Sequence, residues 1–204
     1  MASSNRSRRG HSGSRHGKGK GKSVAGRIFL SLLGLVTLFL VVAVFLPSRC
    51  RLDRDVLVNA TPGVILPQIA NLKQWPEWTV WNRGSDASLS ISYAGPAEGA
   101  GAKSSWSGNK AGTGSMTITE NNPTNGIKYE LTLLNGNFHA SGTISFEPEH
   151  DGTRLFWSID GGLGMNPITR YQGLMLKRKF SQDMELSLQR LKTRVETSKA
   201  RSAP

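Results

Sequence analysis

Between residues 88 and 160, apolar side chains recur at every second position, and this period limits the possible folds more than any other feature of the chain. Such alternation is typical of β-strands with one buried face. Asn135-Gly136 has the sequence of a tight hairpin turn, and the other connections are also short. Short connections make successive strands antiparallel neighbours. We therefore predict six antiparallel strands, at Leu89–Tyr93, Lys103–Ser107, Ser115–Glu120, Ile127–Leu133, Phe138–Phe146 and Leu155–Ile159.

A long helix is predicted after these strands, opened by Asn166-Pro167. Apolar residues three or four apart form a stripe that must pack on the apolar face of the sheet. They are Leu176, Phe180, Met184, Leu188, Leu191 and Val195. The other side is basic, and a solvated face is its simplest interpretation, with contact to acidic lipid as the alternative. Its residues are Lys177, Arg178, Lys179, Arg190, Lys192 and Arg194.

A first strand over residues 51–59 and a short helix beginning at Thr61-Pro62 are predicted before the six strands. Pro67 is expected to interrupt that helix, because proline lacks the N–H that continues the hydrogen-bond ladder. Asn71 is expected to cap a second short helix, with Gln74 as its capping-box partner.

Three of the five tryptophans follow within this second helix and its end: Trp75, Trp78 and Trp81. Tryptophan combines a large apolar ring with one N–H that needs a partner when it is buried. We expect this segment to act as a wedge that packs one element against another.

Residues 28–46 carry no charge and are predicted to form a transmembrane helix. At a rise of about 1.5 Å per residue, their length matches the roughly 30 Å hydrocarbon core of a bilayer. A cleaved signal peptide is the alternative. The following residues, Leu46-Pro-Ser-Arg-Cys50, are a poor cleavage site. The single cysteine rules out an intrachain disulfide.

The net charge of +12 is concentrated in residues 1–27, which hold eight basic residues and no acid. This composition predicts a disordered tail that could attract anionic lipid headgroups, while nucleic-acid binding is not expected. Because basic residues favour the cytoplasmic side, we expect a cytoplasmic N-terminus and a single pass through the inner membrane. The domain would then be extracytoplasmic, which in a bacterium means periplasmic. It is placed at residues 50–198, followed by a disordered tail at 199–204.

Four motifs carry a resemblance to a known family. They are Leu72-x-x-Trp75-Pro76-Glu77-Trp78-x-x-Trp81, Tyr93-x-Gly95-Pro96, Gly99-x-Gly101-Ala102-Lys103-x-x-Trp106-x-Gly108-Asn109 and Gly112-x-Gly114-Ser115-Met116-Thr117-Ile118-Thr119-Glu120. Over residues 50–198 the chain resembles the bacterial polyketide cyclase/dehydrase-like group of the SRPBCC superfamily, which includes START and Bet v 1-like proteins. The resemblance implies an α+β helix-grip fold. In that fold a seven-stranded antiparallel sheet (β-α-α-β6-α) wraps around the C-terminal helix, with a cavity between them.

Strand parity gives the residues that would line such a cavity. The expected ligand-binding residues are Trp106, Met116, Ile118, Tyr129, Leu131, Phe138, Ala140, Gly142, Leu155 and Trp157 from the strands, with Phe180 and Met184 from the helix. Ala140 and Gly142 are small and adjacent on one face, so they could leave space for an apolar ligand. Alternatively, Phe180 and Met184 fill that space and the core is solid.

Residues suited to catalysis are few. No Cys/His/Asp cluster has the spacing of metal ligands, no serine has a nucleophile-elbow context, and no cofactor is expected. His139 has outward parity. The polar candidates for the mouth of a cavity are Glu120, Arg170 and Tyr171.

The leading hypothesis is a membrane-tethered, non-enzymatic domain that binds a hydrophobic small molecule or lipid. The alternatives are a polyketide cyclase or aromatase acting in the same cavity, and a structural or interaction domain with a filled core.

Overall fold

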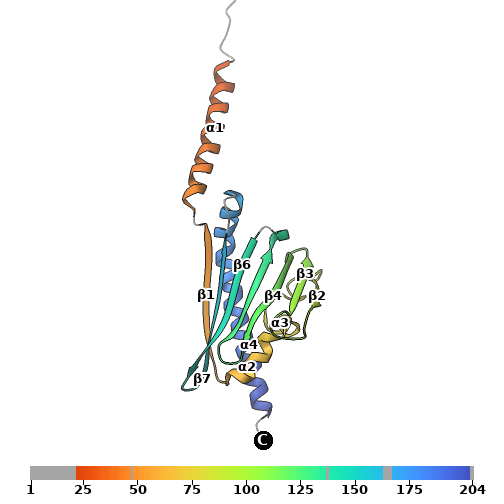
Figure 1. Cartoon of the computed structure of the whole chain (residues 1–204). Helices are drawn as coiled ribbons and strands as arrows, with labels where there is room; N and C mark the ends of the chain where they lie inside the picture. The colour runs from red at the N-terminus through yellow and green to blue at the C-terminus, as the bar shows by residue number, and fades with distance from the viewer. Residues whose placement is uncertain (1–21, 47, 137, 163–166, 203–204) are drawn as a thin grey trace, which may run out of the picture. The chain divides into compact units, whose positions relative to one another are not determined.

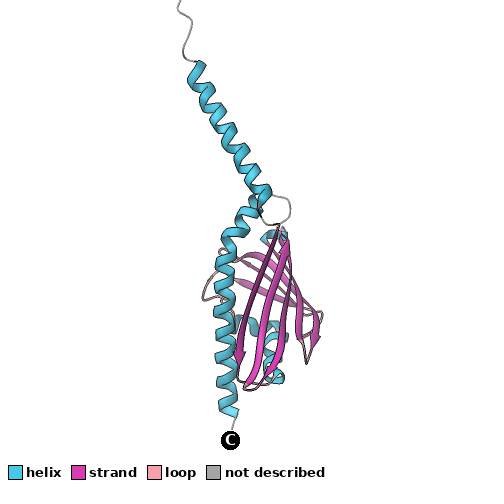
Figure 2. Cartoon of the chain, turned by 90° about the vertical axis from the view of Figure 1, so that its left-hand side faces the viewer, coloured by secondary structure: helices cyan, strands magenta, loops and turns pink. Residues whose placement is uncertain are grey.

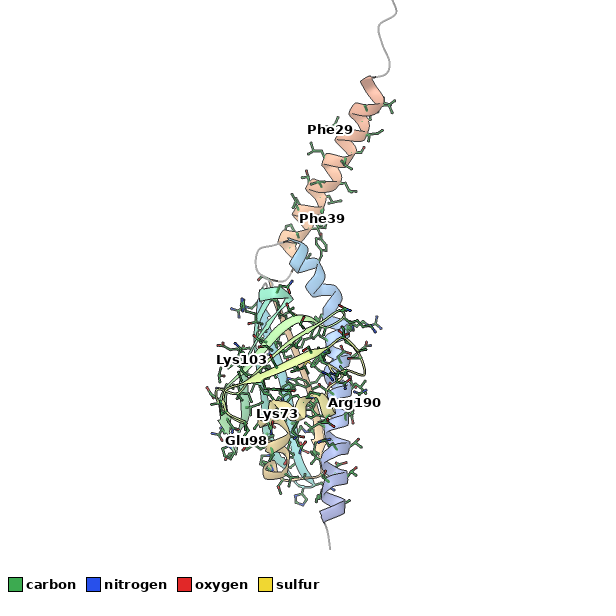
Figure 3. The ribbon with its side chains drawn as sticks, turned by 90° about the vertical axis from the view of Figure 1, so that its right-hand side faces the viewer. Phe29, Phe39, Lys73, Glu98, Lys103 and Arg190 are labelled. Carbon is green, nitrogen blue, oxygen red and sulfur yellow. The ribbon has the colours of Figure 1, made fainter. Side chains whose placement is uncertain are left out.

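The computed structural model describes residues 22–46, 48–136, 138–162 and 167–202. The chain divides into two compact units, residues 1–42 and 43–204, which are described separately. The first contains most of helix α1 (Lys22–Phe45). Its segment Val24–Ala43 has a mean hydropathy of 2.2, and its apolar side chains are exposed apart from Ala43 at its end. Apolar side chains such as Phe29 and Phe39 project from it (Figure 3). Its length and composition suffice to cross a membrane.

The second unit is built on one seven-stranded antiparallel sheet, in the order β1-β7-β6-β5-β4-β3-β2 (Figure 1). The strands are β1 (Arg49–Val58), β2 (Ser90–Ala94), β3 (Lys103–Gly108), β4 (Gly112–Asn122), β5 (Gly126–Leu133), β6 (Phe138–Glu149) and β7 (Gly152–Gly162). Consecutive strands from β2 to β7 are neighbours, as the short connections predicted. The first strand, β1, pairs with the last strand, β7, at one edge of the sheet, and Val56 lies opposite Leu155.

The long helix α4 (Pro167–Ser202) runs along the sheet, in the same direction as β1 (Figure 2). Arg54 of β1 donates to the Ser181 hydroxyl, and farther along Lys199 donates to the carbonyl of Asn59 at 3.0 Å. The stripe residues Met184, Leu188, Leu191 and Val195 are buried and Phe180 is half-buried, while the side chain of Leu176 lies outside the described residues. The predicted helix-grip fold is confirmed. Helix α4 also continues to Ser202, past the predicted domain end at residue 198.

Helix α2 (Pro62–Ala70) corrects one prediction, because it passes through Pro67 without interruption. Proline removes only one hydrogen bond here, and burial of Ile65, Ile69 and Ala70 against the core holds the helix together. The single 3-10 turn η1 (Leu72–Gln74) follows, and then helix α3 (Trp75–Trp78).

Asn71 caps this segment as predicted, with its side chain accepting from the Lys73 N–H at 3.0 Å. Gln74 is not used as the predicted capping-box partner. Its side-chain oxygen accepts from Arg194 of α4 at 3.0 Å, and Arg194 also donates to Gln68 at 2.9 Å. Nearby, Arg190 donates to the Thr79 carbonyl at 3.4 Å. Arg190 and Arg194 therefore do not form a freely solvated face, because tertiary packing brings acceptors to them.

We predict that Arg194→Ala lowers the free energy of unfolding by about 1–2 kcal/mol, because two amide oxygens lose a charged donor. Urea unfolding followed by tryptophan fluorescence measures this change. Lys192→Ala is the matched control, since Lys192 makes only a long ion pair of 3.9 Å with Glu196 on the same helix. Equal losses in the two variants would contradict the bracing role of Arg194.

Candidate functional site

The predicted strand residues lie on the sheet face that packs against the helices. Trp106 and Phe138 are only half-buried. The others are buried: Met116, Ile118, Tyr129, Leu131, Ala140, Gly142, Leu155 and Trp157. Met184 of α4 joins them and is fully buried. Strand parity thus gave the correct face, while ligand binding by these residues stays a prediction.

An aromatic cluster occupies the middle of this interior. Trp157 of β7 lies edge-on to Trp75, Trp78 and Trp81, with ring centroids 5.7–6.0 Å apart. Tyr129 of β5 lies 5.7 Å from Trp75. On the α4 side, Phe180 lies 5.8 Å from Trp81. The three predicted wedge tryptophans therefore join the short helices to the sheet and to α4.

Each buried indole N–H in the cluster has a partner. Trp75 donates to the Ile69 carbonyl at 2.9 Å and Trp78 to the Gln68 carbonyl at 3.1 Å. Trp157 donates to the Tyr129 hydroxyl at 2.7 Å. Burial raises the pKa of Tyr129 well above its usual value, and the hydrogen bond from Trp157 only partly opposes this. The hydroxyl therefore stays neutral in the core, where it satisfies Trp157.

The small residues of the sheet receive aromatic rings from neighbouring strands. A Cβ atom at Gly142 would lie 2.0 Å from Tyr129 Cζ, and one at Gly114 would lie 2.4 Å from Trp106 Cζ2. Gly161 is covered in the same way by Phe138. Of the two alternatives for Ala140 and Gly142, open space or a filled core, the structure favours the filled one at Gly142, because the Tyr129 ring occupies that space.

The three polar candidates are placed as follows. A β-bulge between Ile118 and Glu120 changes the strand parity, so Glu120 is exposed and pairs with Lys128 at 2.8 Å instead of pointing inward. Tyr171 is half-buried in the first turns of α4. The side chain of Arg170 lies outside the described residues. The outward parity of His139 is confirmed, since it is exposed.

Sequence reasoning missed Asp86, the buried carboxylate among the described residues. It accepts hydrogen bonds from the backbone N–H groups of Lys110 and Ala111, at 2.7 and 3.0 Å. The Ser88 hydroxyl donates to it at 2.6 Å. These hydrogen bonds hold the pKa of Asp86 well below its usual range, and the bond from the Ser88 hydroxyl has the largest effect. The pattern Asp86-x-Ser88 is typical of a local Asx turn, but only the fold brings the β3–β4 hairpin to it.

Half-buried apolar side chains gather at one end of the domain, beyond the aromatic cluster. The strand register shows which residues lie at this end of the sheet. Cys50 lies opposite Gly161, Gly161 opposite Ala140, and Ala140 opposite Leu131. The half-buried residues at this end are Cys50, Trp81, Trp106, Leu133, Phe138 and Phe180, which we call the apolar end. Burial also raises the pKa of Cys50, although the nearby Lys177 ammonium acts in the opposite direction.

Two hollows lined by described residues lie elsewhere, and both are open to solvent. One, of about 760 Å³, runs along the outer side of α4 past Glu77, Gln189 and Arg194. The other, of about 460 Å³, lies on the outer face of the sheet beside Glu130, His139 and Asp160. Neither is the predicted cavity between sheet and helix.

A family model described as polyketide cyclase / dehydrase and lipid transport matches residues 49–196 of the chain. The chain belongs to this family. The match confirms the resemblance carried by the tryptophan and glycine motifs, and its limits nearly coincide with the sheet and α4. The family supports binding of a hydrophobic ligand, or cyclase chemistry, in general terms.

Solved structures show the same fold at low identity. The di-domain ARO/CYC protein StfQ of the steffimycin biosynthetic pathway is 14% identical with a TM-score of 0.56, covering 74% of this chain and 52% of its own. A protein from Mesorhizobium loti, MLL2253, is 13% identical with a TM-score of 0.52, covering 76% of this chain and 99% of its own. No curated protein matches the chain.

For this polyketide cyclase/dehydrase family member, we predict that Gly142→Ala destabilises the fold by about 1–3 kcal/mol, because the added methyl overlaps the buried Tyr129 ring. Gly162→Ala is the control, since it is also a strand glycine but has open space around its Cβ position. Thermal unfolding compares the two variants. A Gly142→Ala protein as stable as Gly162→Ala would show that the ring can move away.

We also predict an acid-dependent role for Asp86. Its folded-state pKa lies below the unfolded value of 3.8, so its contribution is present above about pH 4 and is lost as the pH falls toward the folded pKa. Asp86→Asn should be less stable than the parent at pH 7, and the difference should shrink as the pH falls below 4. Unfolding curves at a series of pH values measure this. A pH-independent difference would contradict the prediction.

Proposed function

We propose that this protein is a membrane-tethered domain that binds a hydrophobic small molecule or lipid at its apolar end. The observation that carries the proposal is the uneven burial of the interior. The middle of the domain is closed by the aromatic cluster, whereas six apolar side chains at one end remain half-buried. When a ligand covers apolar side chains that are partly solvated, the binding free energy becomes more favourable by about 25 cal/mol per Å² of apolar surface removed from water.

The aromatic cluster sets the depth of the proposed site. Within the apolar end, Trp81 contacts both Trp157 of the aromatic cluster and Phe180. The Tyr129 ring occupies the space above Gly142. A ligand would therefore rest on Trp81 and Phe180 instead of passing along the whole sheet. Trp106 and Phe138, which lie over Gly114 and Gly161, would contact its sides. This geometry suits a compact apolar ligand, or one segment of a longer lipid.

The tether is proposed from helix α1. Its twenty-residue apolar segment is long enough to cross a bilayer, and the poor cleavage site after it favours an uncleaved anchor over a signal peptide. The charge difference across it supports a cytoplasmic basic tail and a periplasmic or other extracytoplasmic domain. Only residues 46–48 separate α1 from β1, so the chain from Phe45 to Arg49 reaches at most about 14 Å.

A cyclase would need polar groups that converge on a bound substrate. In the described interior, the Tyr129 hydroxyl already accepts from Trp157, and the Asp86 carboxylate holds a hairpin. No observation here favours the cyclase alternative over simple binding. The filled-core alternative is tested directly by ligand binding.

We predict that a fragment of residues 48–204 binds the uncharged fluorescent probe N-phenylnaphthylamine and co-purifies with an apolar molecule detectable by native mass spectrometry. The fragment contains the second compact unit's whole sheet and α4. Phe138→Gln should weaken probe binding roughly fivefold, the equivalent of about 1 kcal/mol of lost apolar contact. Leu66→Gln is the control, because Leu66 is also a half-buried apolar residue but lies on α2.

Equal weakening by the two substitutions would contradict binding at the apolar end. No probe binding and no co-purified molecule would favour the filled-core alternative.

A further inference from the structure

Three consecutive basic residues, Lys177, Arg178 and Lys179, are exposed on α4. Successive residues in an α-helix are about 100° apart, so the three together cover most of the circumference of one turn. The next residue, Phe180, supplies the side of the turn that faces the core. At this level of α4, the whole solvent-facing side of the helix is therefore positively charged.

These three residues differ from the basic residues farther along the helix. Arg190, Arg194 and Lys199 donate to oxygen atoms of other elements, and Lys192 lies 3.9 Å from Glu196. Across the described part of the chain, by contrast, no carboxylate lies within ion-pair distance of Lys177, Arg178 or Lys179. Their charge is thus not used to hold the domain together.

The basic turn lies beside the start of β1. Lys177 acts electrostatically on Cys50, and the exposed Arg49 precedes Cys50 in the same strand. Acidic residues also lie near this end of the domain. Asp53 pairs with Arg51 at 3.1 Å, and Asp160 lies opposite Arg51 in the sheet. On α4, Asp183 follows Lys179 by four residues, but it is not within ion-pair distance of it. We call Arg49, Lys177, Arg178 and Lys179 the basic collar. It lies on the β1 and α4 side of the same end of the domain that carries the half-buried apolar residues.

We propose that the basic collar is a docking surface for anionic lipid headgroups, which holds the apolar end of the domain against the bilayer surface. The proposal rests on the tether proposed above and deepens it. If α1 spans the membrane, the short connection keeps Arg49 within the reach of the headgroup layer, where basic side chains are attracted to anionic lipid. Docking in this orientation would let an apolar ligand pass from the bilayer to Trp106 and Phe138 with little exposure to water.

The experiment uses the full chain reconstituted into vesicles of phosphatidylcholine, or of equal parts phosphatidylcholine and phosphatidylglycerol. The reporter is a polarity-sensitive dye on Gln182→Cys in a Cys50→Ser background, because Gln182 is exposed one turn beyond the collar. The proposal predicts a shift of the dye emission to shorter wavelength in the anionic vesicles only. About 1 M NaCl, at which the Debye length is about 3 Å, should abolish the shift.

The collar variant Lys177→Glu/Arg178→Glu/Lys179→Glu should lose the shift. The control variant Lys73→Glu/Lys103→Glu/Lys128→Glu changes the net charge equally at exposed positions away from the collar, and it should keep the shift (Figure 3 shows Lys73 and Lys103). Loss of the shift in both variants, or in neither, would overturn the proposal. So would an equal shift produced by soluble glycerol phosphate in phosphatidylcholine vesicles, because the collar would then bind a free phosphate.

Flotation of the vesicles after an alkaline wash separates the two proposals. A chain that floats but shows no lipid-dependent shift retains the tether and overturns the docking surface. A chain that does not float overturns the tether and, with it, the docking surface that depends on it.

Discussion

The hydrogen bond from the Trp157 indole to the Tyr129 hydroxyl is the interaction on which the interior depends. It joins two strands that are not neighbours, β5 and β7, across the intervening β6. Both side chains are almost completely buried, so loss of either partner would leave a polar group without a partner in an apolar core. Trp75 and Trp78 pack on this pair, and their own N–H groups are satisfied by carbonyls at the end of α2. The short helices are thereby fixed against the sheet mainly by apolar and aromatic packing.

Glycine and aromatic residues act together in this sheet. At Gly142, Gly114 and Gly161 a missing side chain on one strand makes room for a ring from another. The packing stays dense where the sheet curves, because one flat ring fills the volume that its own side chain and the missing glycine side chain would otherwise share. It also decides where a ligand could fit. The middle of the sheet is filled, and the least covered apolar surface is at the end that carries Phe138 and Trp106.

Helix α4 divides into two parts by the use of its charges. In its second half, Arg190, Arg194 and Lys199 meet oxygen atoms of α2, α3 and the end of β1, so charge supports the packing of Leu188, Leu191 and Val195. In the part near residue 178, the basic side chains face solvent. The apolar stripe of α4 therefore covers the core along the helix. The basic side chains on the rest of its surface bind the domain in the second half of the helix, whereas those near residue 178 are exposed to solvent.

Much of the fold followed from local pattern. The period of two over residues 88–160, the turn residues between the strands and the stripe on α4 were enough to predict six antiparallel strands and the face that is buried, because these depend on side-chain alternation and short connections. The seven-stranded sheet wrapped around the helix was predicted only from the family resemblance. The apolar character of residues 24–43 is likewise a property of composition. The site was less predictable. A bulge turned Glu120 outward, and a ring from the neighbouring strand filled the space at Gly142. Two of the donors to Asp86 lie more than twenty residues away in the sequence. These outcomes depend on which atoms the completed fold brings together and on the volume left between them, so only the tertiary structure decided them.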